Sequence, residues 1–391
     1  MKPLDWAHFA HTYWNRSIAK LTDAAPFDVG SMFDMACRCS APFRAGTRFQ
    51  ATPDVRFHVL GASLAAPGEL LPTVEDGSLD GYLSRITNDP RIPGFQLRIV
   101  QPLALDFSWW STMRDRLQGL WHEVGLPLSP AIVELTIGHG VAVRALLDET
   151  SHAELNWVAQ GRVRLRLLDS RSGITHRLQA RAGQLLCWPA HCRLLDSELE
   201  QGVLVRVRIP FDRRLPAVMI KQALIESVQA QRGQPDEDQV PYLPLLRVTR
   251  GRASASVGPL TDTAHALSAL GKSVDLARTL RINWLRRVSA AALEPVPIAR
   301  KETALPPSQY LRMPSPDAVV RMRDGRHGWI WAVNGHVFSL RGALATRLLA
   351  RLRDGITWHV AELCDEQDEG VLALLQRLYV LHAIVLVDAE N

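Results

Sequence analysis

The stretch that most constrains the fold runs from residue 134 to residue 211, where apolar residues alternate with charged ones. β-branched or aliphatic runs occupy residues 141–143, 155–158, 163–168 and 204–209. A period of two, with one apolar and one charged face, is typical of half-buried antiparallel strands. Turns are predicted at Gly161, residues 169–173, Gly183 and Gly202. Short strands, regular turns and no long intervening helix predict a β-sandwich or jelly roll.

Two residue spacings inside this stretch are more specific than the strand pattern. The first consists of Asp148, Thr150, Glu154 and Gly161, and the second of Gly183, Pro189, His191 and Leu194. This pair of spacings resembles the paired signature of the cupin fold, including its JmjC-type branch of iron- and 2-oxoglutarate-dependent oxygenases. The resemblance implies an α+β protein built on a double-stranded β-helix.

The resemblance also identifies where the metal ligands would lie. In metal-binding members the first motif supplies a His and then a His or an Asp, and the second supplies another His. Here those positions hold Asp148, Thr150 and Leu194. A ferrous oxygenase site needs two imidazoles and a carboxylate, whereas Thr is a poor ligand and Leu is none. We therefore expect a degenerate site without bound metal.

The position of the cosubstrate anchor leads to the same expectation. In ribosomal-oxygenase-type members a basic residue two places after the motif glycine anchors 2-oxoglutarate. That place is Val163 here, while Arg162 and Arg164 fall on the opposite face of the strand. Neither iron nor 2-oxoglutarate is thus expected as a cofactor; an active protein would need both.

Other polar residues leave alternatives open. Asp148, His152, Glu154 and His191 could form a relocated metal site, although exposed or structural roles are the simpler interpretation for them. Five arginines are predicted to form one basic sheet face for an acidic peptide or protein partner: Arg162, Arg164, Arg166, Arg206 and Arg208. Outward solvated arginines are the simpler alternative there as well.

The remaining chain is predicted to contain further domains. Residues 1–212 form the JmjC/cupin-like barrel with an N-terminal α/β preface, and residues 213–293 form a helical region whose apolar stripes predict a homodimer. Six prolines mark residues 294–316 as a linker. Residues 317–391 are predicted to form a winged helix. This order resembles the architecture of ribosomal oxygenases.

Composition narrows the function classes. The 391 residues carry a net charge of +5, which suits an acidic partner. The absence of a long apolar run argues against a membrane protein, and five cysteines without a C-x-x-C pair fit a reducing cytoplasm.

Three functions remain open. The first is a silent JmjC/cupin-like protein that binds a peptide or protein, held between the barrel mouth and the winged helix. The second is an iron- and 2-oxoglutarate-dependent peptide or protein hydroxylase with a rearranged site. The third is a nucleic-acid-binding regulator, which the few basic residues of the predicted winged helix disfavour.

Overall fold

The computed structural model describes residues 4–44, 52–140, 142–144, 152–211, 264–265, 267–269, 274–315, 318–324, 328–340, 344–364 and 369–387. The chain divides into two compact units, one comprising Met1–Asp212 with Arg286–Asn391 and the other Arg213–Leu285. Most of residues 213–293, the region predicted to be helical and to form a dimer, lies outside the described residues. Within it, helix α7 (Val274–Ser289) is present as expected.

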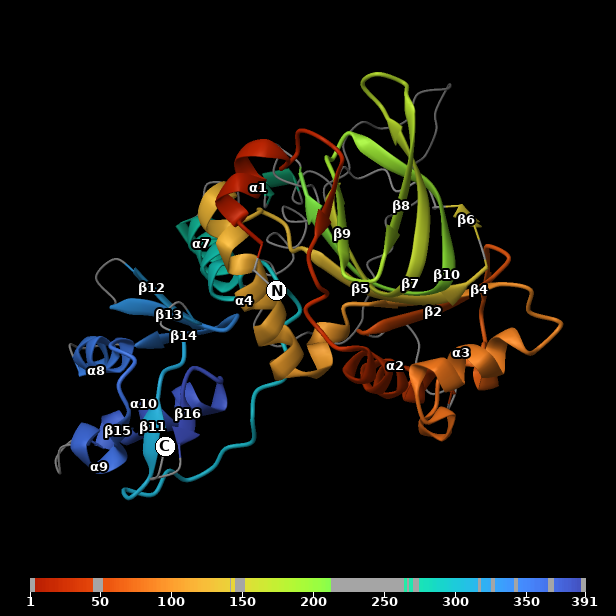
Figure 1. Cartoon of the computed structure of the whole chain (residues 1–391). Coiled ribbons are helices and arrows are strands. Elements are labelled where there is room, and N and C mark those ends of the chain that lie inside the picture. The colour runs from red at the N-terminus through yellow and green to blue at the C-terminus, as the bar shows by residue number, and fades with distance from the viewer. Residues whose placement is uncertain are drawn as a thin grey trace, which may run out of the picture. The chain divides into compact units, whose positions relative to one another are not determined.

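The largest element of the first unit is an antiparallel sheet that curves into an open barrel (Figure 1). Its strand order is β1 (Ala19–Thr22), β9 (Gln184–Trp188), β7 (His152–Asp169), β10 (Cys192–Pro210), β5 (Ile132–His139), β4 (Phe95–Val100), β2 (Asp54–Val59) and β3 (Ala62–Leu64). Strand β6 (Ala142–Arg144) also pairs with β10, and β8 (Thr175–Arg181) pairs with β7. The predicted antiparallel architecture of residues 134–211 is confirmed.

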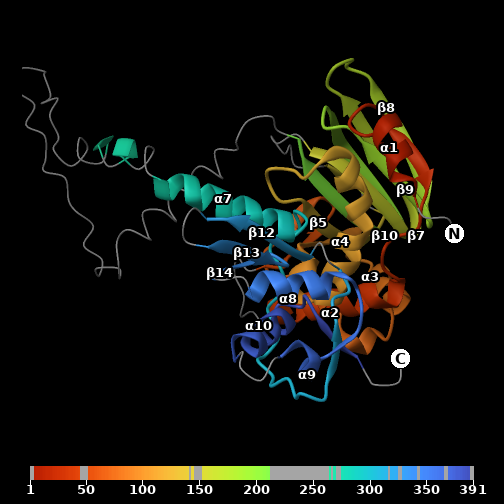
Figure 2. The same cartoon turned by 90° about the vertical axis from the view of Figure 1, so that its left-hand side faces the viewer.

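Helices from the N-terminal part cover one face of this sheet. They are α1 (Trp6–Thr12), α2 (Val29–Arg44), α3 (Leu79–Thr87) and α4 (Phe107–Val124), with 3-10 turns η1 (Gly68–Leu70), η2 (Val74–Asp76) and η3 (Pro102–Leu105). Figures 1 and 2 show α2 and α3 beside the sheet, and their apolar residues share one core with β2, β4 and β5. Helix α4 begins where the Asp106 carboxylate accepts hydrogen bonds from the backbone N–H groups of Ser108 and Trp109.

At Gly161 the odd-numbered side chains of the long strand β7 change from one side of the sheet to the other. Before that glycine, Leu155 and Trp157 pack into the core beneath the helices. After it, Val163 and Leu165 belong to a second apolar cluster inside the barrel. Gly161 has a φ of +69°, and the β7–β10 register shifts close by. The prediction of a chain-reversing turn at Gly161 is therefore wrong, because the residue forms a bulge within a continuous strand.

The C-terminal part builds its own core from helices and two small sheets. One sheet has the order β12 (Val319–Arg323), β13 (Trp329–Val333), β14 (His336–Leu340), and the other β15 (Trp358–His359), β11 (Tyr310–Arg312), β16 (Val385–Val387). The helices are α8 (Leu344–Arg353), α9 (Val360–Leu363) and α10 (Glu369–Val380), and Figure 2 shows α8 beside the first sheet. The winged helix stays a prediction.

One segment differs from its expected role. Residues 294–316 were expected to be a linker, yet they contribute strand β11, which pairs with both β15 and β16. The prolines limit regular structure in this segment, but Leu305, Leu311 and Met313 are buried in the C-terminal core. Burial of these three apolar side chains attaches the segment to the C-terminal core. Among the described helices, none is both long and apolar enough to cross a membrane.

Candidate functional site in the barrel interior

One end of the barrel interior carries buried charged side chains from four neighbouring strands. Glu134 lies on β5, Glu154 on β7, Arg98 on β4, and Arg206 and Arg208 on β10. The sheet register places Arg206 opposite Glu134 and Arg208 opposite Glu154. Because directly opposed residues of antiparallel strands point to the same face, these five side chains meet inside the barrel. We call them the interior ion-pair cluster.

The cluster is tightly connected. Arg206 binds Glu154 through two hydrogen bonds, with Nε–Oε2 at 2.6 Å and Nη2–Oε1 at 2.7 Å. Arg98 Nη2 lies 2.8 Å from Glu134 Oε2, and Arg208 Nη1 lies 3.5 Å from Glu134 Oε1. The Glu134 side chain is only 2% exposed. Burial alone would raise the pKa of Glu134, but Arg206, Arg98 and Arg208 together hold it near 2.

Little space remains beside these side chains. The cavity has a volume of about 40 Å³ and is lined by polar and apolar side chains, namely Gln96, Arg98, Thr136, Asn156, Leu165, Trp188, Leu194, Ser197, Leu204 and Arg206. A water molecule needs roughly 10–15 Å³ of such volume, so the cavity has room for a few waters. The side chains that line this cavity thus leave little room beside the interior ion-pair cluster.

The three frame positions, at which the family motif would place metal ligands, are residues 148, 150 and 194, and the structure describes only one of them. Leu194 is half-buried on β10, packs against the apolar cluster inside the barrel and offers no donor atom. Asp148 and Thr150 lie outside the described residues. Val163, at the place of the cosubstrate anchor, is buried, whereas Arg162 and Arg164 are exposed on the other face as expected.

The predicted relocated ligands His152 and Glu154 both lie at the start of β7. His152 is buried, with its Nδ1 atom 3.4 Å from Arg208 Nη2. Glu154 already accepts both hydrogen bonds from Arg206. A metal ion at Glu154 would have to displace that guanidinium, so the existing arrangement favours an ion pair over a ligand pair.

The five arginines expected on one basic face are divided between two environments. Arg206 and Arg208 point into the barrel, with side chains 15% and 10% exposed. Arg162, Arg164 and Arg166 lie on the exposed outer face of β7. The expectation of one shared face is wrong because the bulge at Gly161 and the pairing partners on β5 and β7 decide which side each arginine occupies. Partner binding by these residues stays a prediction.

His191 is brought together with two residues that sequence reasoning missed. Its Nε2 atom lies 3.8 Å from Asp169 Oδ1, and Cys192 completes a group whose candidate ligand atoms all lie within 4.8 Å of one another. Cys192 pairs directly with Asp169 across β10 and β7. The one sequence signal for this group was the turn from Pro189 to His191. The pairing of Cys192 with Asp169 became known only from the register of β7 and β10.

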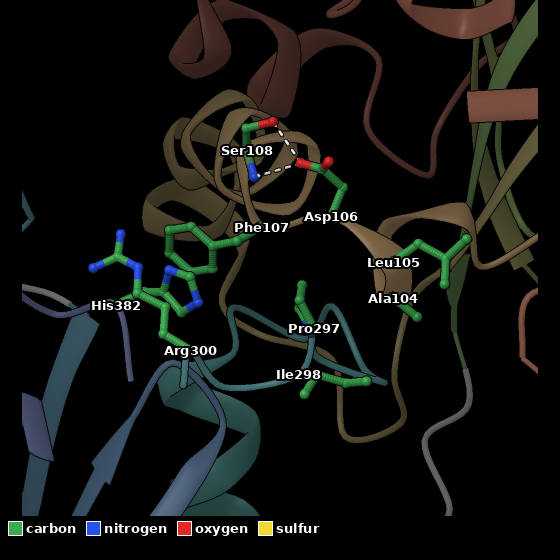
Figure 3. A pocket seen from close by; sticks show the side chains of 9 residues that line it. All are labelled: Ala104, Leu105, Asp106, Phe107, Ser108, Pro297, Ile298, Arg300 and His382. Carbon is green, nitrogen blue, oxygen red and sulfur yellow. Dashed lines mark hydrogen bonds between the residues drawn. The ribbon is translucent and has the colours of Figure 1, made fainter. Parts of the chain in front are cut away.

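A larger cleft of about 420 Å³ lies beside the start of α4 (Figure 3). It is lined by Ala104, Leu105, Asp106, Phe107, Ser108, Pro297, Ile298, Arg300 and His382. Phe107 and His382 stack with ring centroids 3.8 Å apart, and burial together with nearby Arg300 lowers the pKa of His382 to about 4. Asp106 caps α4, and Arg300 donates to the carbonyls of Tyr379 and Ile384. Asp106 and Arg300, the charged groups of this cleft, therefore already make hydrogen bonds that hold the local structure.

Comparison with known proteins shows the fold. No known family profile matches the chain, and no curated protein matches its sequence. The structure is similar to the ribosomal oxygenase YcfD from Escherichia coli in complex with cobalt and succinic acid, with a TM-score of 0.54 and 14% identity over 98% of this chain and 99% of that one. The same protein with cobalt and 2-oxoglutarate gives a TM-score of 0.52 at 13% identity, covering 98% and 99%.

Proposed function

We propose that this chain, which has the cupin/JmjC-type fold of the ribosomal oxygenases, binds an acidic peptide or protein segment and performs no iron- and 2-oxoglutarate-dependent turnover. The interior ion-pair cluster carries the proposal. Arg206 and Arg98 are held on Glu154 and Glu134 by short hydrogen bonds, and the cavity beside them measures about 40 Å³. Leu194 offers no donor atom at the position of the distal ligand.

An oxygenase would have to rebuild this interior. The neighbours of known structure hold cobalt together with succinic acid or 2-oxoglutarate. Admitting a comparable dicarboxylate here would require breaking buried charge pairs, and removing one partner of such a pair typically costs about 3–5 kcal/mol. The interior ion-pair cluster therefore argues against a catalytic role for the barrel.

The exposed face of β7 and β8 supports an acidic partner. Five arginines lie there, which we call the outer arginine ladder: Arg162, Arg164, Arg166, Arg177 and Arg181. The register places Arg162 opposite Arg181 and Arg166 opposite Arg177. Like charges directly opposed across strands are destabilising. Carboxylates of a partner would relieve this repulsion, and arginine binds them through short directional hydrogen bonds.

The chain neutralises only part of this ladder. Arg164 lies 2.9 Å from Glu198, and Arg166 pairs with Asp196. Among the described residues, no carboxylate lies within ion-pair distance of Arg162, Arg177 or Arg181. In addition, β8 pairs with β7 alone among the described strands. An extended acidic segment could add along its other edge and direct carboxylates toward Arg177 and Arg181.

The metal half of the proposal is tested by anaerobic reconstitution with Fe(II), followed by elemental analysis and calorimetry with 2-oxoglutarate. We expect no 2-oxoglutarate binding that depends on iron. Near one equivalent of iron with tight 2-oxoglutarate binding would overturn the proposal and favour a hydroxylase with a rearranged site. The variant His191→Gln, measured in parallel, identifies iron held at His191 instead.

The partner half is tested with a fluorescent acidic peptide of alternating Glu and Val residues. We expect binding that weakens as salt rises, since exposed charges are screened within about 8 Å at physiological ionic strength. The double variant Arg177→Glu/Arg181→Glu should bind at least tenfold more weakly. Arg56→Glu/Arg91→Glu, with the same charge change at exposed arginines outside the ladder, should bind normally. Equal losses in both variants, or tighter binding of an RNA duplex than of the peptide, would contradict the proposal.

A further inference from the structure

We propose that Asp169, His191 and Cys192 form a binding site for a divalent transition-metal cation of the zinc type. The site is separate from the frame positions 148, 150 and 194 and does not depend on the proposed partner. All three residues lie at the end of the barrel where β7 finishes and β10 begins, with Asp169 and Cys192 on the strands and His191 in the turn before β10. Nitrogen, sulfur and oxygen ligands from His, Cys and Asp are those that zinc accepts in proteins.

The sheet register brings two of these ligands together. Cys192 opens β10 directly opposite Asp169, the last residue of β7. Opposed residues of antiparallel strands share a face, so the thiol and the carboxylate point the same way. Cys192 also belongs to the apolar cluster inside the barrel, and partly buried Leu194, two residues later, packs against that cluster. A cation at Cys192 would therefore lie one strand repeat away from the frame position at Leu194.

The turn before β10 supplies the imidazole. The backbone N–H of Cys192 donates to the Pro189 carbonyl at 2.9 Å, which closes a tight turn with His191 at its third position. The N–H of Ser170 donates to the His191 carbonyl at 3.0 Å and joins this turn to the end of β7. As a result, His191 Nε2 comes within 3.8 Å of Asp169 Oδ1.

The carboxylate is fixed before any ion binds. Asp169 accepts a hydrogen bond from the Arg171 N–H at 2.8 Å and another from the Ser172 hydroxyl at 2.8 Å. Such outer partners orient metal ligands and restrict their motion.

The imidazole has an unsatisfied atom. Nδ1 of His191 is buried and has no hydrogen-bond partner within the part of the chain that the structure describes. Buried polar atoms in native proteins are nearly always paired. A cation bound at Nδ1 would give this atom a partner. The Asp169 carboxylate lies 3.8 Å from the other ring nitrogen, Nε2, which is also beyond the roughly 2.7–3.2 Å of an ordinary hydrogen bond.

The geometry favours zinc over hard cations. Ligand atoms around tetrahedral zinc lie about 2.0–2.3 Å from the metal and hence roughly 3.5 Å from one another. The present separations within 4.8 Å need only a small closure of side chains at a turn. Magnesium and calcium would require oxygen ligands in place of the thiol and the imidazole. Three protein ligands leave a fourth position for water or another donor.

The test uses the full chain, stripped with a chelator and titrated with Co(II), whose thiolate complexes absorb in the near ultraviolet. We expect a thiolate-to-cobalt band that saturates near one equivalent and disappears when Zn(II) is added. Cys192→Ser should abolish the band, and His191→Gln should weaken Co(II) binding at least tenfold. Zn(II) should also raise the Tm of the wild type, because a ligand of the folded state stabilises it.

Controls separate this site from other thiols and from the barrel frame. Cys187→Ser replaces a buried thiol on β9 whose Sγ lies 3.7 Å from the Ala19 carbonyl oxygen, and it should retain the band. Asp148→Asn/Thr150→Ala should retain it too. Absence of the band in the wild type, or its survival in Cys192→Ser, would overturn the proposal. If Cys192→Ser unfolds, loss of Co(II) affinity in folded His191→Gln decides the question.

Discussion

The pKa of Glu134 links the ion pairs of the barrel interior to the pH dependence of stability. Its pKa near 2 lies below the ordinary value for a glutamate, about 4.3. A carboxyl whose pKa is depressed by folding contributes stability above its unfolded pKa, and this contribution is lost as the pH falls toward the folded value. We therefore expect the free energy of unfolding to drop by on the order of 3 kcal/mol between about pH 4.5 and pH 2.

The variant Glu134→Gln should lose this part of the acid dependence. It should also be less stable at pH 7 by about 3–5 kcal/mol, because Arg98, Arg206 and Arg208 then share one fewer buried carboxylate. Urea unfolding followed by circular dichroism at several pH values measures both effects. Glu123→Gln, at an exposed position, serves as the control. An unchanged acid dependence in Glu134→Gln would assign the acid sensitivity to other groups.

Single residues also show what the sequence could reveal. Val163 and Arg162 lie on opposite faces of β7, as predicted, because strand alternation is a local property. Arg206 and Arg208 do not share the outer face of Arg162, contrary to the prediction of one basic face. Their inward direction depends on Glu134 and Glu154 on other strands, and a charged residue reads as exposed until its buried partner is known.

At the scale of elements, the bulge in β7 determines which side chains enter the barrel. A Cβ atom on Gly161 would lie 2.3 Å from the Gln201 carbonyl oxygen and 2.4 Å from that of Glu200. Gly173 has a similar φ of +72° but open space around the corresponding position. Both positions therefore carry the same backbone strain on substitution, and only Gly161 adds a clash with the neighbouring strand.

We expect Gly161→Ala to lower the free energy of unfolding by at least about 2 kcal/mol more than Gly173→Ala does. The αL strain shared by both variants is roughly 1–2 kcal/mol, and the clash forces β7 and β10 apart. Chemical denaturation of the two variants gives the difference directly. Equal destabilisation would show that the two strands can separate at the bulge without cost.

Elements were easier to predict than their junctions. The runs predicted as strands at residues 163–168 and 204–209 do lie in β7 and β10, because strand alternation is a local signal. Gly161 and Gly202 were expected to end strands, yet β7 and β10 continue through them. A glycine that allows a bulge and a glycine that allows a turn have the same sequence signature. Only the pairing of β7 with β10 distinguishes the two.

At the scale of the whole molecule, the C-terminal part is joined to the barrel part within one compact unit. The indole Nε1 of Trp110 on α4 donates to the Leu293 carbonyl at 2.8 Å, and Arg114 on the same helix lies 3.1 Å from Asn334 Oδ1. Sequence patterns predicted these segments as separate domains, since no local signal reports a contact over 183 residues. A partner held between barrel mouth and winged helix stays a prediction.

The predicted homodimer depends on residues 213–293, of which α7 is the main described part. Leu280 and Trp284 lie one helical turn apart on α7 and are 36% and 40% exposed. Apolar side chains at this spacing form one stripe, and a second copy of the chain would cover it. A stable interface of this kind buries more than about 1,200 Å² in total. We therefore expect a dimer at micromolar concentration.

The variant Trp284→Glu should shift this dimer toward monomer, because a carboxylate buried in an apolar interface has no compensating partner. Light scattering coupled to size exclusion gives the mass of each species. Val74→Glu introduces the same charge at a side chain that is 75% exposed on η2, and it should remain dimeric. A monomeric wild type would remove the prediction, and equal dissociation of both variants would indicate a general charge effect rather than an interface on α7.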